Sequence, residues 1–379
     1  MIRIASYNVE NLFARPKAFS TGVLFNEPAV DAFHEVSQLI AQPIYSNNDK
    51  NRIIQLLLQL EIYRTDQSGM VRRKWSANPR WAWLRKNRGS FDVERQTTGI
   101  EIVANGRNDW IGWVELAVEP TNELSVRMTA KVIADVQPNI FAIVEAEDRP
   151  SLVRFNHELL SDQFEHVMLL DGNDTRGIDV GLMTTTNFPI GPIRSNVDAT
   201  DNTGIIFSRD CPEYQVTTPN GNQLYVLVNH LKSQSGGGGQ KRQRQANEIR
   251  RIVDRHVSQG HHVVVLGDLN EGPPNTNSTV QNFSSLYTNN SPLIDVYSLP
   301  MFNQGSRPGT FDSCGIRNRL DYIFISQSLS NLIVGGTIFR QGLWGSRQSR
   351  PTNWVTYPEM QRSEDQASDH ALVYIDLNL

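Results

Sequence analysis

The sequence contains few cysteines and no long hydrophobic run. Cys211 and Cys314 are its only two cysteines among 379 residues, too few for a disulfide framework, so we expect a reducing compartment. No stretch of about 18 apolar residues occurs, and we expect no membrane-spanning helix. Residues 1–8 lack the apolar stretch of a signal peptide. These absences predict a cytoplasmic protein without a membrane partner.

Neither sign of charge is in large excess. The chain has 36 Lys and Arg against 40 Asp and Glu, a net charge of −4, so binding to nucleic acid would require a local basic patch. A hydrophobic fraction of 39% and a charged fraction of 20% are typical of a globular protein with a substantial core. The length allows one large α/β domain or two ordinary ones.

Helical and strand patterns alternate along the chain. Apolar residues at helical spacing predict helices over about 49–63, 122–136, 151–160 and 243–257. Short apolar or alternating runs predict strands over 2–7, 140–144, 224–228, 263–266, 322–325 and 371–377. Asn105-Gly106 lies between two strand-like runs and predicts a hairpin turn. The alternation indicates a mixed α/β protein.

Polar side chains follow three of the predicted strands. Glu145 comes after 140–144, His230 after 224–228 and Asp268 after 263–266. Ligand sites of open α/β sheets lie at the carboxyl ends of strands. We therefore expect these three side chains to share a site.

The segment Gly267-Asp268-Leu269-Asn270 is the first of three short polar motifs. On an extended segment, Asp268 and Asn270 would point the same way and could orient a water molecule. The alternative is an Asx turn that merely closes a strand. The apolar run before Gly267 favours the site.

The other two motifs are Arg319-Leu320-Asp321-Tyr322 and Ser368-Asp369-His370. A buried Asp behind a His sets the tautomer and charge of the ring, and clustered carboxylates hold a hard cation such as Mg²⁺. The alternative is an Asp–His pair that only caps the core. Together with the first motif, this pattern is typical of phosphate-ester hydrolysis.

With these motifs, the sequence resembles the endonuclease/exonuclease/phosphatase superfamily, which includes DNase I. The resemblance extends from the first strand to the last and covers residues 7–11, 144–145, 229–233, 267–270, 319–322 and 368–370. The stretch Arg176 to Val180 also resembles a bacterial group of unassigned substrate. The resemblance implies a four-layer α/β sandwich, with two mixed sheets packed face to face and flanked by helices. It also implies one domain over 1–379, with a family-atypical insertion or accessory lobe at 14–121.

The resemblance implies catalytic roles for five residues. Asp321 would orient His370, which acts as general base or stabilises the transition state. Asp268 and Asn270 would orient the attacking water and contact the phosphate. His230 would bind a phosphate oxygen or assist the leaving group.

It also implies a metal site built from Glu145, Glu10 and Asp369. Mg²⁺ suits such oxygen ligands, and Mn²⁺ should substitute. Asn8 would lie beside Glu145 and bind phosphate or orient that carboxylate.

Three further residues are candidates for binding phosphate or substrate. Lys232 could contribute positive charge, or it could be a solvated lysine. Arg176 could clamp a phosphate bidentately, or it could form a structural pair with Asp179.

The segment 14–121 is rich in tryptophan and in basic residues. It contains five of the seven tryptophans: Trp75, Trp81, Trp83, Trp110 and Trp113. Aromatic side chains interleaved with cations are typical of surfaces that bind single-stranded nucleic acid. Alternatively, these tryptophans pack the core of an accessory lobe that has a solvated basic edge.

We therefore expect a Mg²⁺-dependent nuclease that hydrolyses phosphodiester bonds of DNA or RNA. One alternative is a phosphatase or phosphodiesterase acting on a small or lipid phosphate ester, as inositol phosphatases and sphingomyelinases do. A non-catalytic binding module is a third hypothesis, which the presence of every expected Asp and His disfavours.

Overall fold

The computed structural model describes residues 1–19, 27–174, 176–234, 238–273, 282–287, 290–345 and 354–379. The chain divides into two compact units. The sandwich unit comprises Met1–Phe13 and Thr121–Leu379, and the insert unit comprises Ala14–Pro120. None of the described helices combines the length and the hydrophobicity needed to cross a bilayer.

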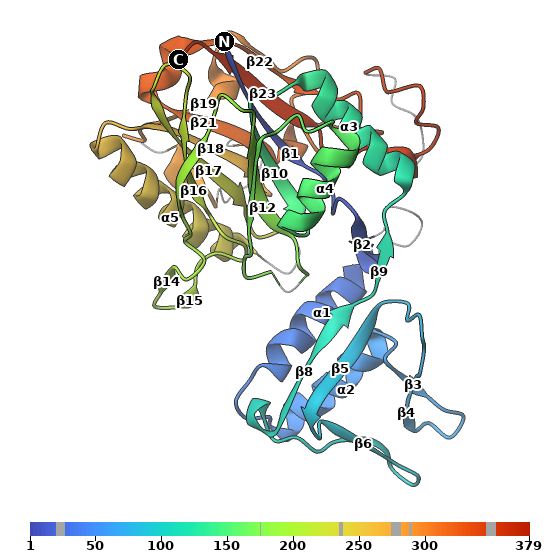
Figure 1. The fold of residues 1–379 in the computed structure, drawn as a ribbon. Coiled ribbons are helices and arrows are strands. Elements are labelled where there is room, and N and C mark those ends of the chain that lie inside the picture. Colours follow the sequence, from blue (N-terminus) through green and yellow to red (C-terminus); the bar gives the residue numbers. More distant parts are fainter. Residues whose placement is uncertain (20–26, 175, 235–237, 274–281, 288–289, 346–353) are drawn as a thin grey trace. The chain divides into compact units, whose positions relative to one another are not determined.

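The first sheet of the sandwich unit has seven strands in the order β11-β12-β10-β1-β23-β22-β20. Their bounds are β1 (Ile2–Asn8), β10 (Ile140–Ala146), β11 (His166–Leu170), β12 (Asp179–Thr184), β20 (Phe302–Asn303), β22 (Ile333–Phe339) and β23 (Leu372–Leu377). Strand β1 runs parallel to β10 and antiparallel to β23. The first and last strands are therefore neighbours, and the two ends of the chain meet (Figure 1).

The second sheet has six strands in the order β13-β16-β17-β18-β21-β19. Their bounds are β13 (Ile190–Arg194), β16 (Glu213–Thr217), β17 (Gln223–His230), β18 (His262–Asp268), β19 (Leu293–Asp295) and β21 (Asp321–Ser326). Strand β17 runs parallel to β18, whereas β21 runs antiparallel to β18. Both sheets are thus mixed. The short strands β14 (Thr200–Asp201) and β15 (Gly204–Ile205) form a separate ribbon.

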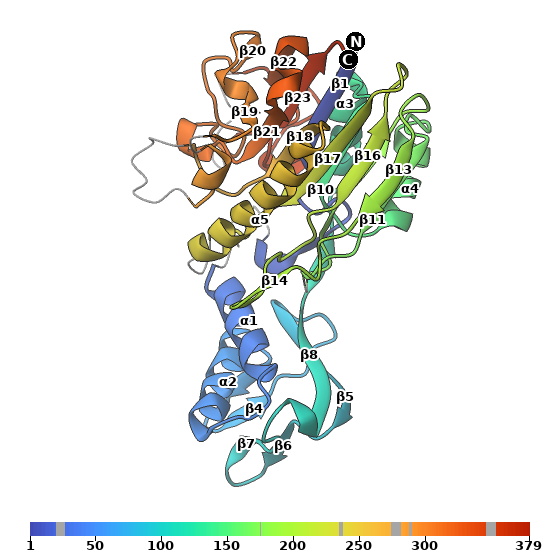
Figure 2. The ribbon, with the colours of Figure 1, turned by 90° about the vertical axis from the view of Figure 1, so that its left-hand side faces the viewer.

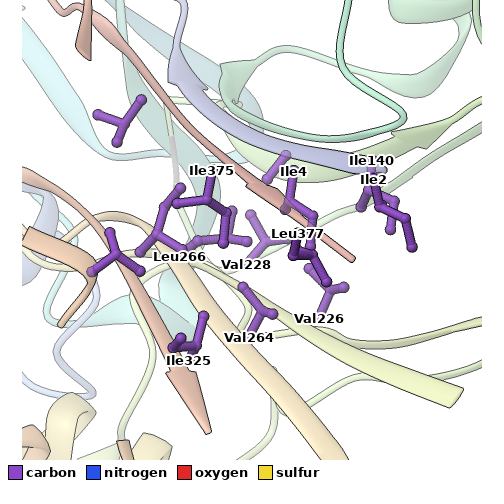
Figure 3. Close-up of a cluster of buried hydrophobic side chains, with 14 of the residues drawn as sticks. Ile2, Ile4, Ile140, Val226, Val228, Val264, Leu266, Ile325, Ile375 and Leu377 are labelled. Carbon is purple, nitrogen blue, oxygen red and sulfur yellow. The ribbon is translucent and has the colours of Figure 1, made fainter. Parts of the chain in front are cut away.

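Side chains from both sheets interdigitate in the main core (Figure 3). Ile4 and Ile375 come from the seven-stranded sheet, and Val226 and Leu266 from the six-stranded sheet. All four are 0% exposed. Apolar area of this kind contributes roughly 25 cal/mol per Å² buried, so packing between the two sheets stabilises the sandwich unit.

Helices cover the outer faces of the sheets (Figure 2). Helices α3 (Glu123–Val136) and α4 (Arg149–Leu159) belong to a second core with Phe141 and Ile143 of the seven-stranded sheet. Helix α5 (Gly239–Ser258) packs on Val263 and Val265 of the other sheet. The predicted four-layer sandwich is confirmed, because each sheet buries one face against its partner and the other against helices.

Short 3₁₀ helices connect the main elements. They are η1 (Lys17–Phe19), η2 (Arg107–Asp109), η4 (Ser284–Leu286), η5 (Val296–Ser298), η6 (Ile316–Asn318), η7 (Gln327–Leu332) and η8 (Ser363–Asp365).

The described residues of the insert unit, 14–19 and 27–120, form two α-helices, four strand pairs and a core of their own. The helices are α1 (Glu27–Ile40) and α2 (Asn47–Gln59). The strand pairs are β2 (Ala14–Pro16) with β9 (Val118–Pro120), β3 (Tyr63–Thr65) with β4 (Val71–Arg73), β5 (Ala82–Gly89) with β8 (Trp110–Leu116), and β6 (Asp92–Arg95) with β7 (Gly99–Ile102). Phe33, Leu57, Phe91, Trp81 and Trp110 are among the buried residues of the core.

Two predictions about the insert unit were wrong. The helix predicted over 49–63 ends at Gln59, and Tyr63 instead begins β3. The predicted hairpin at Asn105-Gly106 is absent, since β7 pairs with β6 and β8 pairs with β5. Gly106 is needed for close approach instead, because a Cβ atom there would lie 1.8 Å from the Pro43 carbonyl oxygen.

Candidate active site

The candidate site forms where strands of both sheets end. His230, Asp268 and Asp321 are paired directly in register across β17, β18 and β21. On the other sheet, Asn8 at the end of β1 pairs with Val144, the residue before Glu145. This register brings together polar residues that are far apart in the sequence.

Asp268 lies at the centre of this cluster and is 2% exposed. Its Oδ2 atom accepts hydrogen bonds from Nδ2 of Asn8 and from Nδ2 of Asn270, each at 3.2 Å. The same oxygen lies 3.7 Å from Nε2 of His230 and 3.9 Å from Nε2 of His370. Two amides and two imidazoles thus surround one carboxylate oxygen.

The predicted pairing of Asp321 with His370 is present. Nδ1 of His370 lies 2.7 Å from Oδ2 of Asp321, whose side chain is 0% exposed. The backbone N–H of Asp321 donates to Oγ1 of Thr310. The ring is held so that Nε2 faces Asp268 and lies 3.9 Å from Oδ1 of Asp369.

The two histidines beside Asp268 differ in charge. Burial alone would lower the pKa of His370, but the carboxylates of Asp321, Asp268 and Asp369 raise this pKa well above its ordinary value. Burial lowers the pKa of His230 well below its ordinary value, and the positive charges of Arg176 and His370 lower it further. Protonated His370 and neutral His230 therefore flank the same carboxylate.

The extended segment predicted for Asp268 and Asn270 is not present. Asn270 reaches Asp268 through a turn instead. Its φ angle is 56°, and its backbone N–H donates to Oδ1 of Asp268 at 2.8 Å. This is the Asx turn considered as an alternative. The turn still brings the Asn270 amide against Asp268 and the Leu231 carbonyl oxygen.

Left-handed backbone conformations recur around the site. The φ angles are 52° at Glu10, 56° at Asn11, 67° at Glu145 and 56° at Asn270. Each such conformation costs free energy in a residue with a side chain, and persists only where the surroundings enforce it. Such strained residues are often found at functional sites, and these four lie among the candidate site residues or next to them.

The candidate metal ligands are carboxylates that accept nearby N–H groups. Oε2 of Glu145 accepts a hydrogen bond from Nδ2 of Asn11 at 3.2 Å, and its Oε1 lies 3.5 Å from Nε2 of His230. Oε2 of Glu10 accepts the backbone N–H of Asp369 at 2.9 Å. The backbone N–H of Glu10 donates to Oδ1 of Asn8 at 3.0 Å.

The candidate ligand atoms are of the kind that a hard divalent cation prefers, because all of them are carboxylate or amide oxygens. Within the described ranges, no three His, Cys, Asp or Glu side chains are arranged to hold a metal ion. Glu145 and Glu10 are each stabilised by an N–H donor within reach, the Asn11 amide and the Asp369 backbone respectively.

Arg176 forms an ion pair with Asp174 and not the pair with Asp179 that was one of its two alternatives. Its Nη2 lies 2.8 Å from Oδ2 of Asp174, which also binds Nε of Arg209 at 2.8 Å. Asp179 instead accepts the backbone N–H of Gly172 at 2.7 Å. Burial raises the pKa of Asp179 to about 7, and nearby carboxylates contribute.

Lys232 follows the end of β17 and is only partly exposed. Burial lowers its pKa, and the positive charge of Arg176 lowers it further. A partly desolvated cation beside His230 is attractive to a phosphate, whereas a fully solvated lysine would contribute little.

Sequence reasoning assigned no role to two residues that support the site. Asn11 donates to Glu145, and Thr310 accepts the backbone N–H of Asp321. Asn11 lies in the first matching motif, 7–11, which could have indicated its role. Thr310 lies in a loop without any pattern, so only the fold reveals its position.

A comparison with family models matches residues 98–344 to one described as the Endonuclease/Exonuclease/phosphatase family. No match was found among curated proteins. Several solved structures are similar to the chain. The catalytic domain of human Nocturnin has 19% identity and a TM-score of 0.49, covering 69% of this chain and 88% of its own.

Two other similar structures are of proteins with different names or activities. A mannosyl-6-phosphatase of Bacteroides thetaiotaomicron has 14% identity and a TM-score of 0.48, over 68% of this chain and 92% of its own. Truncated TDP2 of Caenorhabditis elegans has 18% identity and a TM-score of 0.45, over 66% and 90%. The family match spans well over half of the sequence. The chain belongs to the Endonuclease/Exonuclease/phosphatase family, whose members hydrolyse phosphate esters.

Proposed function

We propose that this protein is a metal-dependent nuclease that hydrolyses phosphodiester bonds of DNA or RNA. The observation that carries the proposal is the arrangement of four polar side chains around Oδ2 of Asp268. Support for nucleic acid comes from the insert unit, which has 14 Lys and Arg against 12 Asp and Glu, whereas the rest of the chain has 22 against 28.

In this proposal, Asp268 and Asn270 orient a water molecule for in-line attack on phosphorus. His370, held by Asp321, stabilises the charge that develops on the phosphate while it carries its proton, or acts as the general base once it has lost that proton. His230 donates a hydrogen bond to a phosphate oxygen or assists the leaving group. Held in place by buried partners, these groups need little reorganisation during the reaction.

Family members commonly use divalent metal ions, and we propose Mg²⁺, with Mn²⁺ as a substitute. Glu145, Glu10 and Asp369 would hold the ion, and Asn8 would orient them or contact phosphate. The ion would supply positive charge against the phosphate oxygens.

Two cations beside His230 are proposed to bind phosphate. Lys232 and Arg176 both contribute positive potential at the His230 ring. Asp179 is proposed to contribute to substrate binding by holding Gly172 in place through the Gly172 backbone N–H.

The test is cleavage by the purified full chain with Mg²⁺, with Mn²⁺ or with EDTA. The substrates are single- and double-stranded oligonucleotides, RNA, inositol phosphates and a chromogenic phosphodiester. We expect His370→Ala to lower nucleic-acid cleavage by about 10²- to 10⁴-fold, the usual contribution of a positioned acid or base.

His157→Ala is the matched control, because His157 forms the same kind of pair with Asp162, at 2.9 Å, on the surface. It should cleave at the wild-type rate. Turnover of small esters alone would contradict the nuclease proposal. Full activity in His370→Ala would contradict the proposed site.

A further inference from the structure

A groove of about 300 Å³ lies in the insert unit, with aromatic walls and a basic rim. It is formed by the β3–β4 hairpin, by the loop that follows β4 and by the start of β5. Tyr63, Trp75 and Trp83 supply its aromatic surface. Trp75 is 89% exposed, whereas Trp81 and Trp110 are 3% and 2% exposed and belong to the core.

This distribution divides the tryptophans of 14–121 between two roles. Packing explains Trp81 and Trp110, which are surrounded by apolar neighbours. It does not explain Trp75, since exposing a whole indole to water forgoes the stabilisation that burial would provide. Trp75 and Trp83 both line the groove, so together they offer aromatic surface on which a flat ligand can stack.

Each carboxylate in the groove is shared between two cations. Glu61 pairs with Lys74 and with Arg80, which lies 3.1 Å away.

Asp92 pairs with Lys86 at 2.6 Å and with Arg73 at 3.2 Å. Three lining cations, Arg73, Lys74 and Lys86, against the two lining carboxylates leave the groove with a small excess of positive charge, which attracts an anion.

A cation also stacks on one of the indoles. The guanidinium of Arg85 lies 4.7 Å from the ring centroid of Trp83. A ligand that placed a flat ring near these indoles would therefore place its negative charges near several cations. A nucleotide has this combination of groups.

We propose that this groove binds a single-stranded segment of the nucleic acid substrate. A base stacks on Trp75 beside Trp83, and the adjoining phosphates lie against Lys74 and Lys86. A duplex is disfavoured, because its bases are already stacked on one another and do not present a free face to an indole. This inference rests on the proposed nuclease function and identifies where its substrate is held.

The first test is the binding of fluorescently labelled oligothymidylate to the full chain in EDTA, measured by anisotropy. Trp75→Ala should weaken binding about tenfold, the order expected for the loss of one stacked base. Because the side chain is exposed, the variant should fold normally. Trp113→Ala is the matched control, since Trp113 is 48% exposed but lies on β8 outside the groove. It should bind like the wild type.

The second test is the salt dependence of the same binding. Lys74→Gln should reduce the slope of log K against log salt concentration by about 0.7, the value for one phosphate contact to a single strand. Lys50→Gln, on α2 away from the groove, should leave the slope unchanged. An unchanged slope in Lys74→Gln would contradict the proposed phosphate contact.

The outcomes separate this inference from the proposed function. If the wild type cleaves nucleic acid but Trp75→Ala binds oligothymidylate normally, the groove proposal is wrong and the nuclease proposal stands. If the wild type hydrolyses only small esters, both are wrong. If polyglutamate binds as tightly as oligothymidylate and Trp75→Ala weakens both equally, the assignment of the groove to nucleic acid is wrong. Duplex binding equal to single-strand binding would overturn the strand preference.

Discussion

The sandwich unit and the insert unit each bury a carboxylate among polar partners, and the two carboxylates behave in opposite ways. Asp268 of the sandwich unit is 2% exposed, and Asp92 of the insert unit is 6% exposed. Burial raises the pKa of Asp268 to about 7, and the nearby Asp321 carboxylate adds to the effect. Burial alone would also raise the pKa of Asp92, but Lys86, Tyr63 and Arg73 lower it below its ordinary value.

The difference lies in the partners. Asp92 has direct contacts with the Lys86 ammonium, the Arg73 guanidinium and the Tyr63 hydroxyl, which donates at 2.7 Å. Asp268 has weaker amide donors, and its histidine neighbours lie beyond hydrogen-bonding distance. Bonded cations offset the cost of burying a charge, and neutral amides do so only in part.

This contrast suggests how to distinguish structural from functional carboxylates in this protein. Asp92 is fully compensated inside the protein and holds its groove together. Asp268 is left incompletely compensated, as is typical of groups that interact with a substrate. The following predictions test this distinction.

The largest expected effect is that of Asp268→Asn on catalysis. The amide keeps the shape of the side chain but loses its negative charge, so turnover of the preferred substrate should fall about 10³-fold. The midpoint of thermal unfolding should not fall, because an incompletely compensated buried charge is removed. Activity assays and calorimetry on the same preparation measure both. A large drop in unfolding temperature would assign Asp268 a structural role.

Asp92→Asn should lower the stability of the protein and leave its catalysis unchanged. Loss of the charge leaves Lys86 and Arg73 facing each other, and the free energy of unfolding should fall by about 3 kcal/mol. Hydrolysis of a small phosphodiester should be unchanged. Urea denaturation measures the loss, with Glu94→Gln, on the same strand but more exposed, as the control. Equal stability of Asp92→Asn and the wild type would remove the contrast.

A smaller effect is expected at Glu213. This residue tests whether the pKa of a buried carboxylate depends on its bonded partners or on the unit that contains it. Glu213 is a buried carboxylate of the sandwich unit, outside the site, and binds His256 at 2.5 Å, Asn196 at 2.9 Å and Arg255. Although burial opposes ionisation, these partners lower its pKa from 4.5 to about 2.

Because the folded protein lowers this pKa, Glu213 stabilises the fold above pH 4.5, and the contribution is lost as the pH falls towards 2. Glu213→Gln should therefore lower the free energy of unfolding by about 2 kcal/mol at neutral pH. The gap to the wild type should close as the pH approaches 2. A gap that does not depend on pH would exclude the ionised carboxylate as its cause.

Much of the sandwich could be predicted because its signals are local. Alternating and continuous apolar runs predicted β1, β10, β17, β18, β21 and β23 close to their observed bounds. Helix α3, predicted over 122–136, begins after its N-cap Asn122 and ends at Val136, before Pro138. Turns were harder, as Asn270 illustrates, because a single left-handed residue leaves no periodic signal.

The sequence by itself determined which polar residues stand at the ends of buried strands, because side-chain periodicity depends only on near neighbours. Only the tertiary structure decided which of them meet. It assigned Asp174 rather than Asp179 to Arg176, and it placed Trp75 in water and Trp110 in the core. Such choices depend on which distant segments compete for the same partner and the same buried volume, and strand register and packing settle that competition.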